Sequence, residues 1–367
     1  MAESTTIKQS PQAGPPAALN PVLLASSPHI GSPVAARQLM CRVLIALTPV
    51  TVFGIVLYGL SALATVVVSI AAAEIAELLF RLVTRQDIRN KDLSAAVTGL
   101  LLALVLPPST PLWMTALGAF FAIVVVKEFF GGIGANVFNP ALAGRAFLLM
   151  SFPAAITTWS LPTGLRALFG GIVPDTLTGA TPLGILKQGG SIADVGADFA
   201  LNGLASSPEY GDTLFSLFIG NRGGCIGESS ILLILAGAIY LLATKTIDWR
   251  ASVTMVCTAF VVSFLFGADP VFAVLSGGLL FGAVFMATDY VSAPLTAKGK
   301  LIFGAGAGLM TVLIRNLGSY PEGVTYGILI MNAVTPYLNR LLQKKYGFVP
   351  RKKVSPPKAA ESKGAAK

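Results

Sequence analysis

The chain has 367 residues, of which 54% are hydrophobic and only 12% are charged, and its mean hydropathy is +0.74. A soluble domain carries about 25% charged residues, so this composition excludes a water-soluble globule and predicts a polytopic membrane protein. The net charge of +9 is spread over short loops and a basic C-terminal tail rather than one patch, which argues against nucleic-acid binding.

Ten stretches are apolar enough to be membrane-spanning helices, each of which needs about 20 mostly apolar residues. They are 39–58, 59–80, 94–108, 112–128 and 140–155, followed by 229–245, 249–267, 270–288, 300–316 and 323–342. The shorter apolar stretch 213–220 is a candidate re-entrant segment. The predicted fold class is therefore an all-α integral membrane protein with about ten transmembrane helices.

The predicted organisation has five parts. A polar tail without the hydrophobic core of a signal peptide covers 1–38, and a first five-helix membrane repeat covers 39–155. A loop at 156–212 leads to a second five-helix repeat at 213–346, and a disordered tail covers 347–367.

Charge in the loops predicts how the chain crosses the membrane, because cytoplasmic loops are enriched in Lys and Arg. The loops 81–91, 244–250 and 296–300 are basic, whereas the turns 107–111 and 267–270 have no Lys or Arg. Residues 156–212 hold two basic and five acidic residues. We therefore expect both termini in the cytoplasm and 156–212 outside; only Arg315 departs from this pattern.

Three short matches indicate an internal repeat. Residues 99–105 resemble 278–284, 118–127 resemble 306–315, and 136–145 resemble 332–340, in the same order. Each half has an odd number of spans, so the two copies must be inverted across the membrane, an architecture typical of transporters. The arrangement is similar to that of urea transporters, and chance similarity between apolar segments is the alternative.

Few residues are available to hold a redox metal. The three cysteines, Cys41, Cys225 and Cys257, are scattered, and His29 is the only histidine. A four-thiolate cluster and a bis-histidine haem are therefore excluded within this chain. A redox cofactor held by this chain alone must be organic, and we expect no metal site and no catalytic residue.

The polar stretch DTLTGATPL, residues 175–183, interrupts this apolar sequence. Gly179 and Ala180 are small, and we expect them to leave the Thr181 hydroxyl reachable by a modifying enzyme. A threonine hydroxyl is a poor nucleophile that needs an external base or metal, and Asp175 is placed to help bind that enzyme or its metal. A simple turn between helices is the alternative.

The pattern formed by Asp175, Thr178, Gly179, Ala180 and Thr181 resembles the acceptor motif of flavin transferases, which attach FMN to the final threonine as a phosphoester. The rest of the chain resembles a family that contains the D subunit of Rnf electron-transport complexes (RnfD) and the B subunit of sodium-pumping NADH:quinone reductases (NqrB). The resembling stretches are LPPSTPLWMTALGAF, KEFFGGIGANVFNPALAGRAF, GNRGGCIGESS and FMATDYVSAP.

The resemblance implies covalent FMN on Thr181 and a noncovalent riboflavin within the helices. It implies a bacterial inner-membrane complex, with further A, B, C, E and G subunits, that couples electron flow between ferredoxin and NAD to Na⁺ or H⁺ movement. A flavin transferase would act during maturation, with the flavin loop in the periplasm. The short chain and GNRGG favour the Rnf branch, whereas Tyr290 departs from the usual proline.

Two alternatives remain open at the level of sequence. The first is the B subunit of a Na⁺-translocating NADH:quinone reductase. The second is a passive channel or solute transporter with a urea-transporter-like fold, which would have no use for the acceptor motif. The chain has no dinucleotide-binding fingerprint and no cluster cysteines, so we do not expect it to bind NAD or ferredoxin itself.

Polar residues inside or at the ends of spans are costly in lipid and are candidates for a second flavin site or an ion path. They are Lys127, Glu128, Asn136, Asn139, Arg222, Gly223, Gly224, Glu228 and Asp289.

Some of the polar residues have alternative interpretations. Lys127–Glu128 is either an ion pair or a surface anchor. Glu74 and Glu77, in the predicted second span, lie one helical turn apart. Asn139-Pro140, echoed by Asn332 and Pro336, predicts helix breaks whose free carbonyls could bind a cation or flavin, with packing as the alternative.

Overall fold

The computed structural model describes residues 35–86, 92–162, 179–202, 204–205, 207–220, 222–318, 320 and 322–342. Asp175, Thr178, nearly all of the predicted N-terminal tail and the whole predicted C-terminal tail lie outside these residues. The described residues are helical with connecting turns and form no β-strand, which confirms the predicted all-α class. Every element below belongs to the unit Ala36–Lys367.

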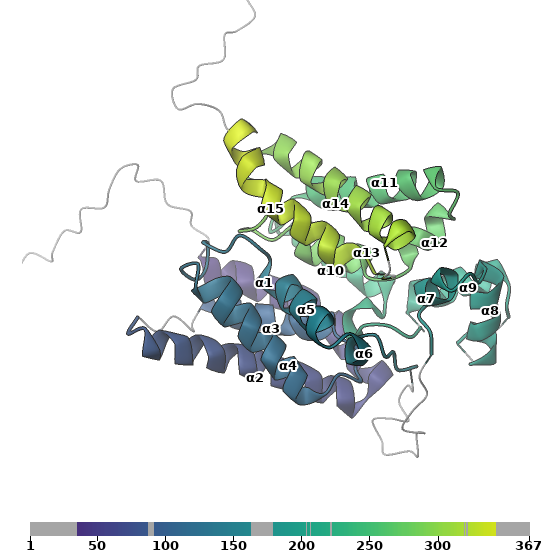
Figure 1. Cartoon of the computed structure of the whole chain (residues 1–367), viewed down its shortest axis with the longest axis horizontal. Helices are drawn as coiled ribbons and strands as arrows, with labels where there is room; N and C mark the ends of the chain where they lie inside the picture. Colours follow the sequence, from purple (N-terminus) through teal and green to yellow (C-terminus); the bar gives the residue numbers. More distant parts are fainter. Residues whose placement is uncertain are drawn as a thin grey trace, which may run out of the picture. The chain divides into compact units, whose positions relative to one another are not determined.

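The first half of the fold is a group of helices that covers the first five predicted spans (Figure 1). These helices are α1 (Ala36–Tyr58), α2 (Leu60–Val83), α3 (Ser94–Leu104), α4 (Leu112–Phe120), the π-helix η2 (Phe121–Glu128), α5 (Pro140–Ser151) and α6 (Pro153–Ile156). The helix α4 runs directly into η2, so the predicted fourth span is one continuous element that ends at Glu128.

The second half forms a corresponding group, preceded by three short helices. The short helices are α7 (Pro182–Lys187), α8 (Ile192–Leu201) and α9 (Tyr210–Ile219). The group consists of η4 (Ile226–Glu228), α10 (Ile231–Ala243), α11 (Trp249–Leu265), α12 (Pro270–Leu275), α13 (Leu279–Phe281), η5 (Gly282–Met286), α14 (Ala297–Leu317) and α15 (Val324–Leu342).

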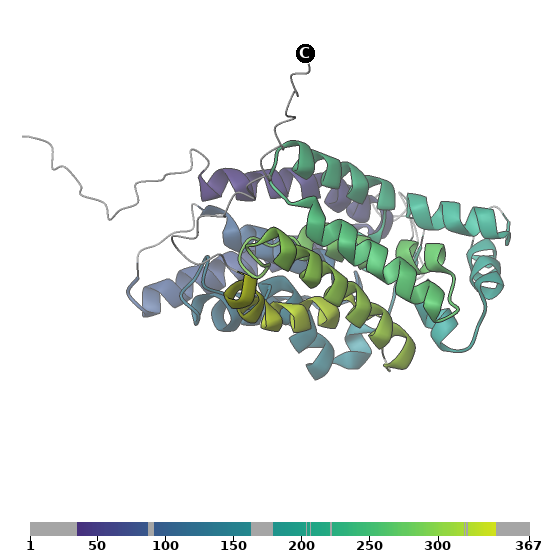
Figure 2. The same cartoon turned by 90° about the horizontal axis from the view of Figure 1, so that it is seen from above.

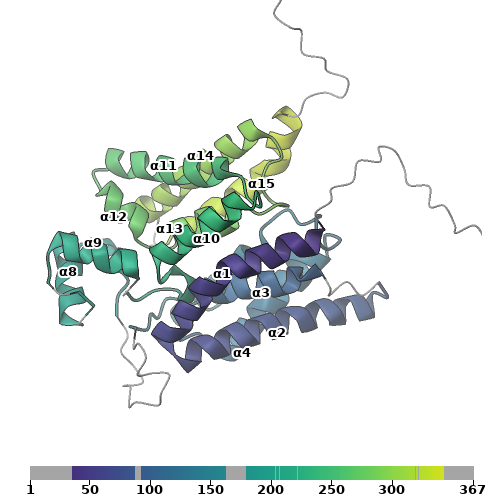
Figure 3. The same cartoon turned by 180° about the vertical axis from the view of Figure 1, so that it is seen from behind.

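The two groups lie side by side, with α1 against α10 and α5 against α15 (Figures 1 and 3). The short helices α7–α9, teal in the view from above, lie at one end of both groups (Figure 2). A small hydrophobic cluster that includes Phe199, Leu217 and Phe272 joins α8 and α9 to α12. The helices α8 and α9 are therefore held against the start of α12.

The ten predicted spans all fall on helical segments, but only some of these are long. Among the described residues, α1, α2 and α14 are long and apolar enough to cross a membrane, and α3, α10 and α11 are apolar but shorter. The predicted span 270–288 is interrupted at 276–278, where Gly277 has a φ of +65°. Ten crossings and an inverted repeat therefore stay predictions.

The two predicted helix breaks at Asn-Pro positions have different outcomes. Asn139 does begin a helix, because its side chain accepts hydrogen bonds from the backbone N–H groups of Ala141 and Leu142 and Pro140 occupies the first turn. The prediction of a break at Pro336 is wrong, since α15 continues through it. A proline removes one N–H group, and packed neighbouring helices tolerate that loss.

Close packing of α11 against α14 depends on two glycines of α14. A Cβ atom on Gly304 would lie 2.4 Å from the Ala251 carbonyl oxygen, and one on Gly308 would lie 2.4 Å from that of Met255. Small residues of this kind let helix backbones approach one another in lipid.

We expect Gly308→Ala to lower the free energy of unfolding by about 1–3 kcal/mol, because the added methyl group overpacks this contact. Thermal unfolding of the purified chain in detergent would measure the change. Leu309→Val, at the neighbouring exposed position, is the matched control. Equal shifts for the two variants would contradict the proposed close contact.

Candidate functional site

Thr181 begins α7, and its hydroxyl is already in use. The Oγ1 atom accepts a hydrogen bond from the Gly184 backbone N–H at 3.0 Å, and Pro182 occupies the first helical position. Gly179 donates its N–H to the Trp159 carbonyl oxygen at 3.1 Å. Gly179 packs closely on Leu161, because a Cβ at 179 would lie 2.7 Å from a Leu161 methyl group.

The expectation that small neighbours leave the Thr181 hydroxyl reachable is wrong for the folded chain. Thr181 is only 6% exposed. The residues that precede it, Gly179 and Ala180, are partly buried as well. The Thr181 hydroxyl thus lies within the fold rather than on an exposed loop.

Thr181 lines a cavity of about 220 Å³. Gly179, Ala180 and Gly184 form the same wall as Thr181. The other lining residues described are Arg145, Leu149, Ile156, Thr157, Trp159, Gln188, Tyr320 and Glu322. The cavity thus combines two aromatic rings, one cation and one carboxylate beside the threonine of the flavin motif.

Arg145 connects this cavity to the interior. Its Nη2 atom forms an ion pair with Glu322, which lies just before α15, and also donates to Cys225 Sγ at 3.4 Å. The side chains of Arg145 and Glu322 are 7% and 13% exposed. The buried Arg145 guanidinium of α5 therefore binds two segments of the second half of the fold. These are the residue just before α15, Glu322, and the loop before α10, which carries Cys225.

The glycine-rich loop at 222–228 has irregular backbone, as predicted, and packs between the two halves. Ile226 donates its N–H to the Leu106 carbonyl oxygen at 3.2 Å, and Cys225 Sγ lies 3.0 Å from the Val105 carbonyl oxygen. Gly223 lies beside Leu161, and a Cβ on Gly224 would lie 3.5 Å from a Glu228 carboxylate oxygen.

Arg222 is buried by this loop and binds the interrupted segment between α12 and α13. Its guanidinium donates to the carbonyl oxygens of Leu275 at 2.7 Å and Gly277 at 3.3 Å. Arg315 donates similarly to Ala273 at 2.6 Å and Ser276 at 3.3 Å. Carbonyl groups freed at this helix break thus bind two guanidinium groups, which occupy the positions that a metal cation would otherwise take.

Three possible ligand atoms do meet beside Arg145. The Cys225 sulfur and one carboxylate oxygen each of Glu228 and Glu322 lie within 4.8 Å of one another. The Arg145 guanidinium already binds two of these groups. A cation would therefore have to displace Arg145 before it could bind here.

Lys127 and Glu128 take part in a second buried network, on α2 and η2. Lys127 Nζ lies 2.7 Å from Glu77 Oε2 and 2.6 Å from Ser94 Oγ. Arg81 Nη2 lies 2.7 Å from Glu77 Oε1 and 3.4 Å from Glu128 Oε1. All four charged side chains are at most 5% exposed. The interpretation of Lys127–Glu128 as a surface anchor is therefore wrong, and each residue pairs with α2 instead.

Asn139 is brought close to the end of η5. Its Nδ2 atom donates to the Met286 carbonyl oxygen at 3.4 Å, three residues before Asp289. The Asp289 carboxylate accepts from Ser292 Oγ at 2.7 Å. Asn136 bonds locally to the Phe138 carbonyl oxygen at 2.9 Å. Asn139 therefore lies close to the turn that carries Asp289, although no sequence pattern predicts that the two segments are neighbours.

Several residues of these sites could not be predicted from a sequence motif. Trp159 and Tyr320 come from connections without a motif, and Glu322 lies in a turn. Arg145 was visible as a charged residue inside an apolar segment, the signal that singled out Lys127. Its partner Glu322 lies 177 residues away in the chain.

The buried charged networks within apolar helical groups define a helical membrane protein with two polar sites. A model of the NQR2, RnfD, RnfE family matches residues 23–347, and the chain belongs to this family. The chain is 43% identical to the D subunit of the proton-translocating ferredoxin:NAD(+) oxidoreductase complex of Clostridium ljungdahlii, over 88% of this chain and 96% of that protein.

Two further relatives show how broad the similarity is. The chain is 40% identical to the D subunit of the Na(+)-translocating ferredoxin:NAD(+) oxidoreductase complex of Acetobacterium woodii, over 90% of this chain and 96% of that protein. It is 37% identical to the D subunit of the ion-translocating oxidoreductase complex of Stutzerimonas stutzeri, over 84% of this chain and 92% of that protein. The resemblance found in the sequence is therefore confirmed.

Proposed function

We propose that this chain is the D subunit of an Rnf-type complex that couples electron transfer between ferredoxin and NAD to ion movement across the membrane. Within it, the chain would relay electrons through FMN attached to Thr181. The observation that carries the proposal is the position of Thr181. In a chain of this family, the last residue of an FMN-acceptor motif lines a cavity with two aromatic rings and a buried arginine.

The residues present fit a phosphoester at Thr181. An ester oxygen keeps lone pairs, so it can still accept the Gly184 N–H that the hydroxyl accepts now. Arg145 lines the same cavity and supplies a positive charge for a phosphate or an electron-rich ring. Because sites for whole ligands span about 300–1,000 Å³, the cavity of about 220 Å³ would hold part of the FMN and leave the rest at its mouth.

FMN supplies one- and two-electron redox chemistry when bound, and the protein supplies orientation and charge. Trp159 and Tyr320 would hold the ring system, while the pair Arg145–Glu322 would set the local charge. The burial of Thr181 supports attachment before this segment closes, so a flavin transferase would act on an open form of the chain.

A noncovalent riboflavin and an ion path are proposed within the helices. Asn139, with the neighbouring Asn136 and Asp289, remains the candidate riboflavin region. Asn332 adds support for a polar ligand, because neither atom of its fully buried amide has a hydrogen-bond partner among the described residues. The candidate ion path includes Glu228 beside Arg222, and the network of Lys127 and Glu128.

The complex would lie in the bacterial inner membrane, with both termini of this chain in the cytoplasm and the flavin loop in the periplasm. Its partners would be the A, B, C, E and G subunits of the Rnf complex. The similarity does not decide between Na⁺ and H⁺, because one relative is named for protons at 43% identity and another for sodium at 40%.

The proposal can be tested with the purified complex in proteoliposomes. We expect reduced ferredoxin to support NAD reduction together with uptake of ²²Na⁺ or of protons reported by a pH dye, and an ionophore should abolish the gradient. NADH-driven quinone reduction without ferredoxin activity would indicate the quinone-reductase branch instead. Passive solute flux in a colourless preparation would indicate a channel.

A further inference from the structure

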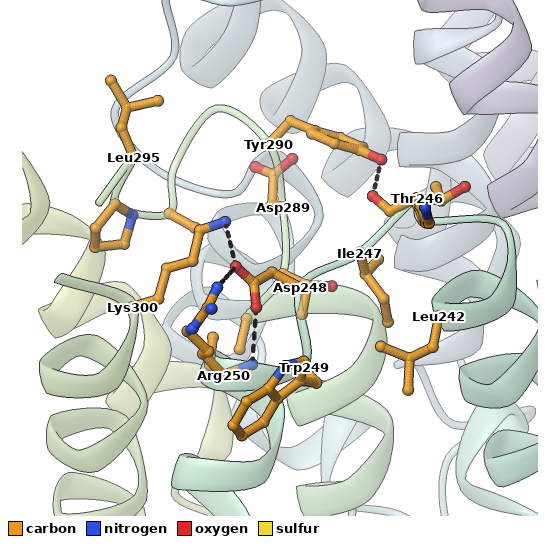
Figure 4. A pocket seen from close by; sticks show the side chains of 16 residues that line it. Leu242, Thr246, Ile247, Asp248, Trp249, Arg250, Asp289, Tyr290, Leu295 and Lys300 are labelled. Atoms are coloured by element: carbon orange, nitrogen blue, oxygen red, sulfur yellow. Dashed lines mark hydrogen bonds and ion pairs between the residues drawn. The ribbon is translucent and has the colours of Figure 1, made fainter. Parts of the chain in front are cut away.

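A cavity of about 490 Å³ lies far along the chain from the flavin motif, where the two basic loops of the second half meet (Figure 4). The loop 244–250 joins α10 to α11, and residues 287–295 lead to the basic stretch 296–300, which forms the cap and first turn of α14. The lysine and arginine content of 244–250 and 296–300 predicts that both stretches face the cytoplasm. The fold thus gathers the basic residues of two loops around one hollow.

Cations outnumber carboxylates among the residues that line this cavity. Lys245, Arg250 and Lys300 face Asp248 and Asp289, which leaves one excess positive charge. Asp248 Oδ2 binds Arg250 Nη1 at 2.8 Å and Lys300 Nζ at 3.1 Å. Lys245 is exposed, and no hydrogen bond or ion pair of its side chain occurs within the described residues. It is the cation that is available for a ligand.

The two carboxylates are occupied by the protein itself. Partial burial acts to raise the pKa of Asp248, but the Arg250 backbone N–H and the Lys300 ammonium group lower it below the ordinary value, so this residue stays charged. Asp289 accepts hydrogen bonds from Ser292 in the following turn. The charge of Asp248 is therefore balanced by two cations, whereas Asp289 is bound only by neutral donors of its own turn.

Two long helices also begin at this cavity. The 17-residue helix α11 starts at Trp249, and the 21-residue helix α14 starts at Ala297, one residue after its cap Thr296. The positive ends of helix dipoles favour phosphate groups. Both helix starts already have side-chain caps, since Asp248 Oδ1 accepts from the Arg250 N–H and Thr296 Oγ1 accepts from the Gly299 N–H, so the side chain of Lys245 is the main feature that favours an anion.

The rim of the cavity is apolar. Trp249 is 51% exposed and Leu295 is 68% exposed, and Leu242 also lines the cavity. The Arg250 guanidinium carbon lies 5.6 Å from the centre of the Trp249 ring. Exposed tryptophan beside basic residues is typical of the membrane–water interface, and a free phosphate compound would have no use for this apolar rim.

We propose that this cavity binds the phosphodiester headgroup of an anionic phospholipid, with Lys245 at the phosphate and Trp249 beside the acyl chains. Anionic lipids of the cytoplasmic leaflet are attracted to basic residues next to the membrane. The proposal does not depend on FMN at Thr181, because the two cavities share no residue; Asp289, which lines this cavity, also belongs to the candidate riboflavin region.

The test uses the full chain in phosphatidylcholine nanodiscs with Trp249 as its only tryptophan, after Trp113→Phe and Trp159→Phe. Brominated phosphatidylglycerol is added, and its quenching of Trp249 fluorescence is measured against brominated phosphatidylcholine with the same acyl chains. We expect saturable quenching by phosphatidylglycerol at a lower mole fraction. Lys245→Gln should raise the half-saturating fraction about fivefold, whereas Lys298→Gln, in the first turn of α14 but outside the cavity, should leave it unchanged.

Three results would overturn the proposal. The two brominated lipids could quench Trp249 equally, or the two lysine variants could behave alike, and either result would mean that no specific headgroup site exists. Displacement of the brominated phosphatidylglycerol by inorganic phosphate or by riboflavin would assign the cavity to a soluble ligand. Retained binding in the presence of both compounds supports the lipid.

Discussion

Arg145→Met is expected to lower the free energy of unfolding by about 3–5 kcal/mol, because it leaves the buried Glu322 carboxylate without its partner. The same change removes the hydrogen bond to Cys225 Sγ. Unfolding of the purified chain in detergent, followed by circular dichroism, would measure the loss. If FMN is attached at Thr181, its reduction potential should fall as well, since a nearby positive charge favours the added electron.

Two comparisons make this prediction specific. Arg145→Met combined with Glu322→Gln should recover part of the lost stability, because no buried charge is then unpaired. Arg250→Met removes an ion pair whose arginine is 38% exposed, and we expect a loss of only about 0–1 kcal/mol there. A loss at Arg145 no larger than that at Arg250 would contradict the buried pair.

Glu77→Gln is expected to have a similarly large effect, about 3–5 kcal/mol. Glu77 is fully buried and accepts from both Lys127 and Arg81, so its loss leaves two cations with only Glu128 to balance them. The matched control is Glu74→Gln, one turn earlier on α2, where the side chain is only partly buried.

The amount of monodisperse protein after extraction, and its unfolding temperature, would compare the two glutamate variants. We expect Glu77→Gln to be recovered poorly and Glu74→Gln to resemble the unaltered chain. Equal recovery would show that the network on α2 and η2 contributes little to the fold.

Composition and periodicity predict the helices well because each helix is a local consequence of its own apolar residues. The all-α class is confirmed, and the helical element over the predicted fourth span does end at Glu128. The prediction that is wrong has its cause in tertiary packing. Pro336 lies in a sequence that predicts a break, but packing of α15 against its neighbours keeps the helix continuous.

The sites could be predicted only in part for the same reason. A local motif indicates Thr181, but its burial, and the cavity that it lines with Arg145 and Tyr320, depend on segments distant in the sequence. Lys127 stands out in sequence as a costly charge in an apolar segment, yet its partner Glu77 is 50 residues away. No local sequence motif predicts the ion pair between Arg145 and Glu322, because Glu322 belongs to the other half of the fold.

Flavin fluorescence in a denaturing gel tests the central claim most directly. The chain would be co-expressed with a flavin transferase, beside Thr181→Val and the control Thr157→Val, which alters another threonine of the same cavity. We expect fluorescent bands from the unaltered chain and from Thr157→Val, and a dark band from Thr181→Val. A dark band from the unaltered chain, with a transferase proven active on another substrate, or a fluorescent Thr181→Val band, would contradict FMN attachment at Thr181.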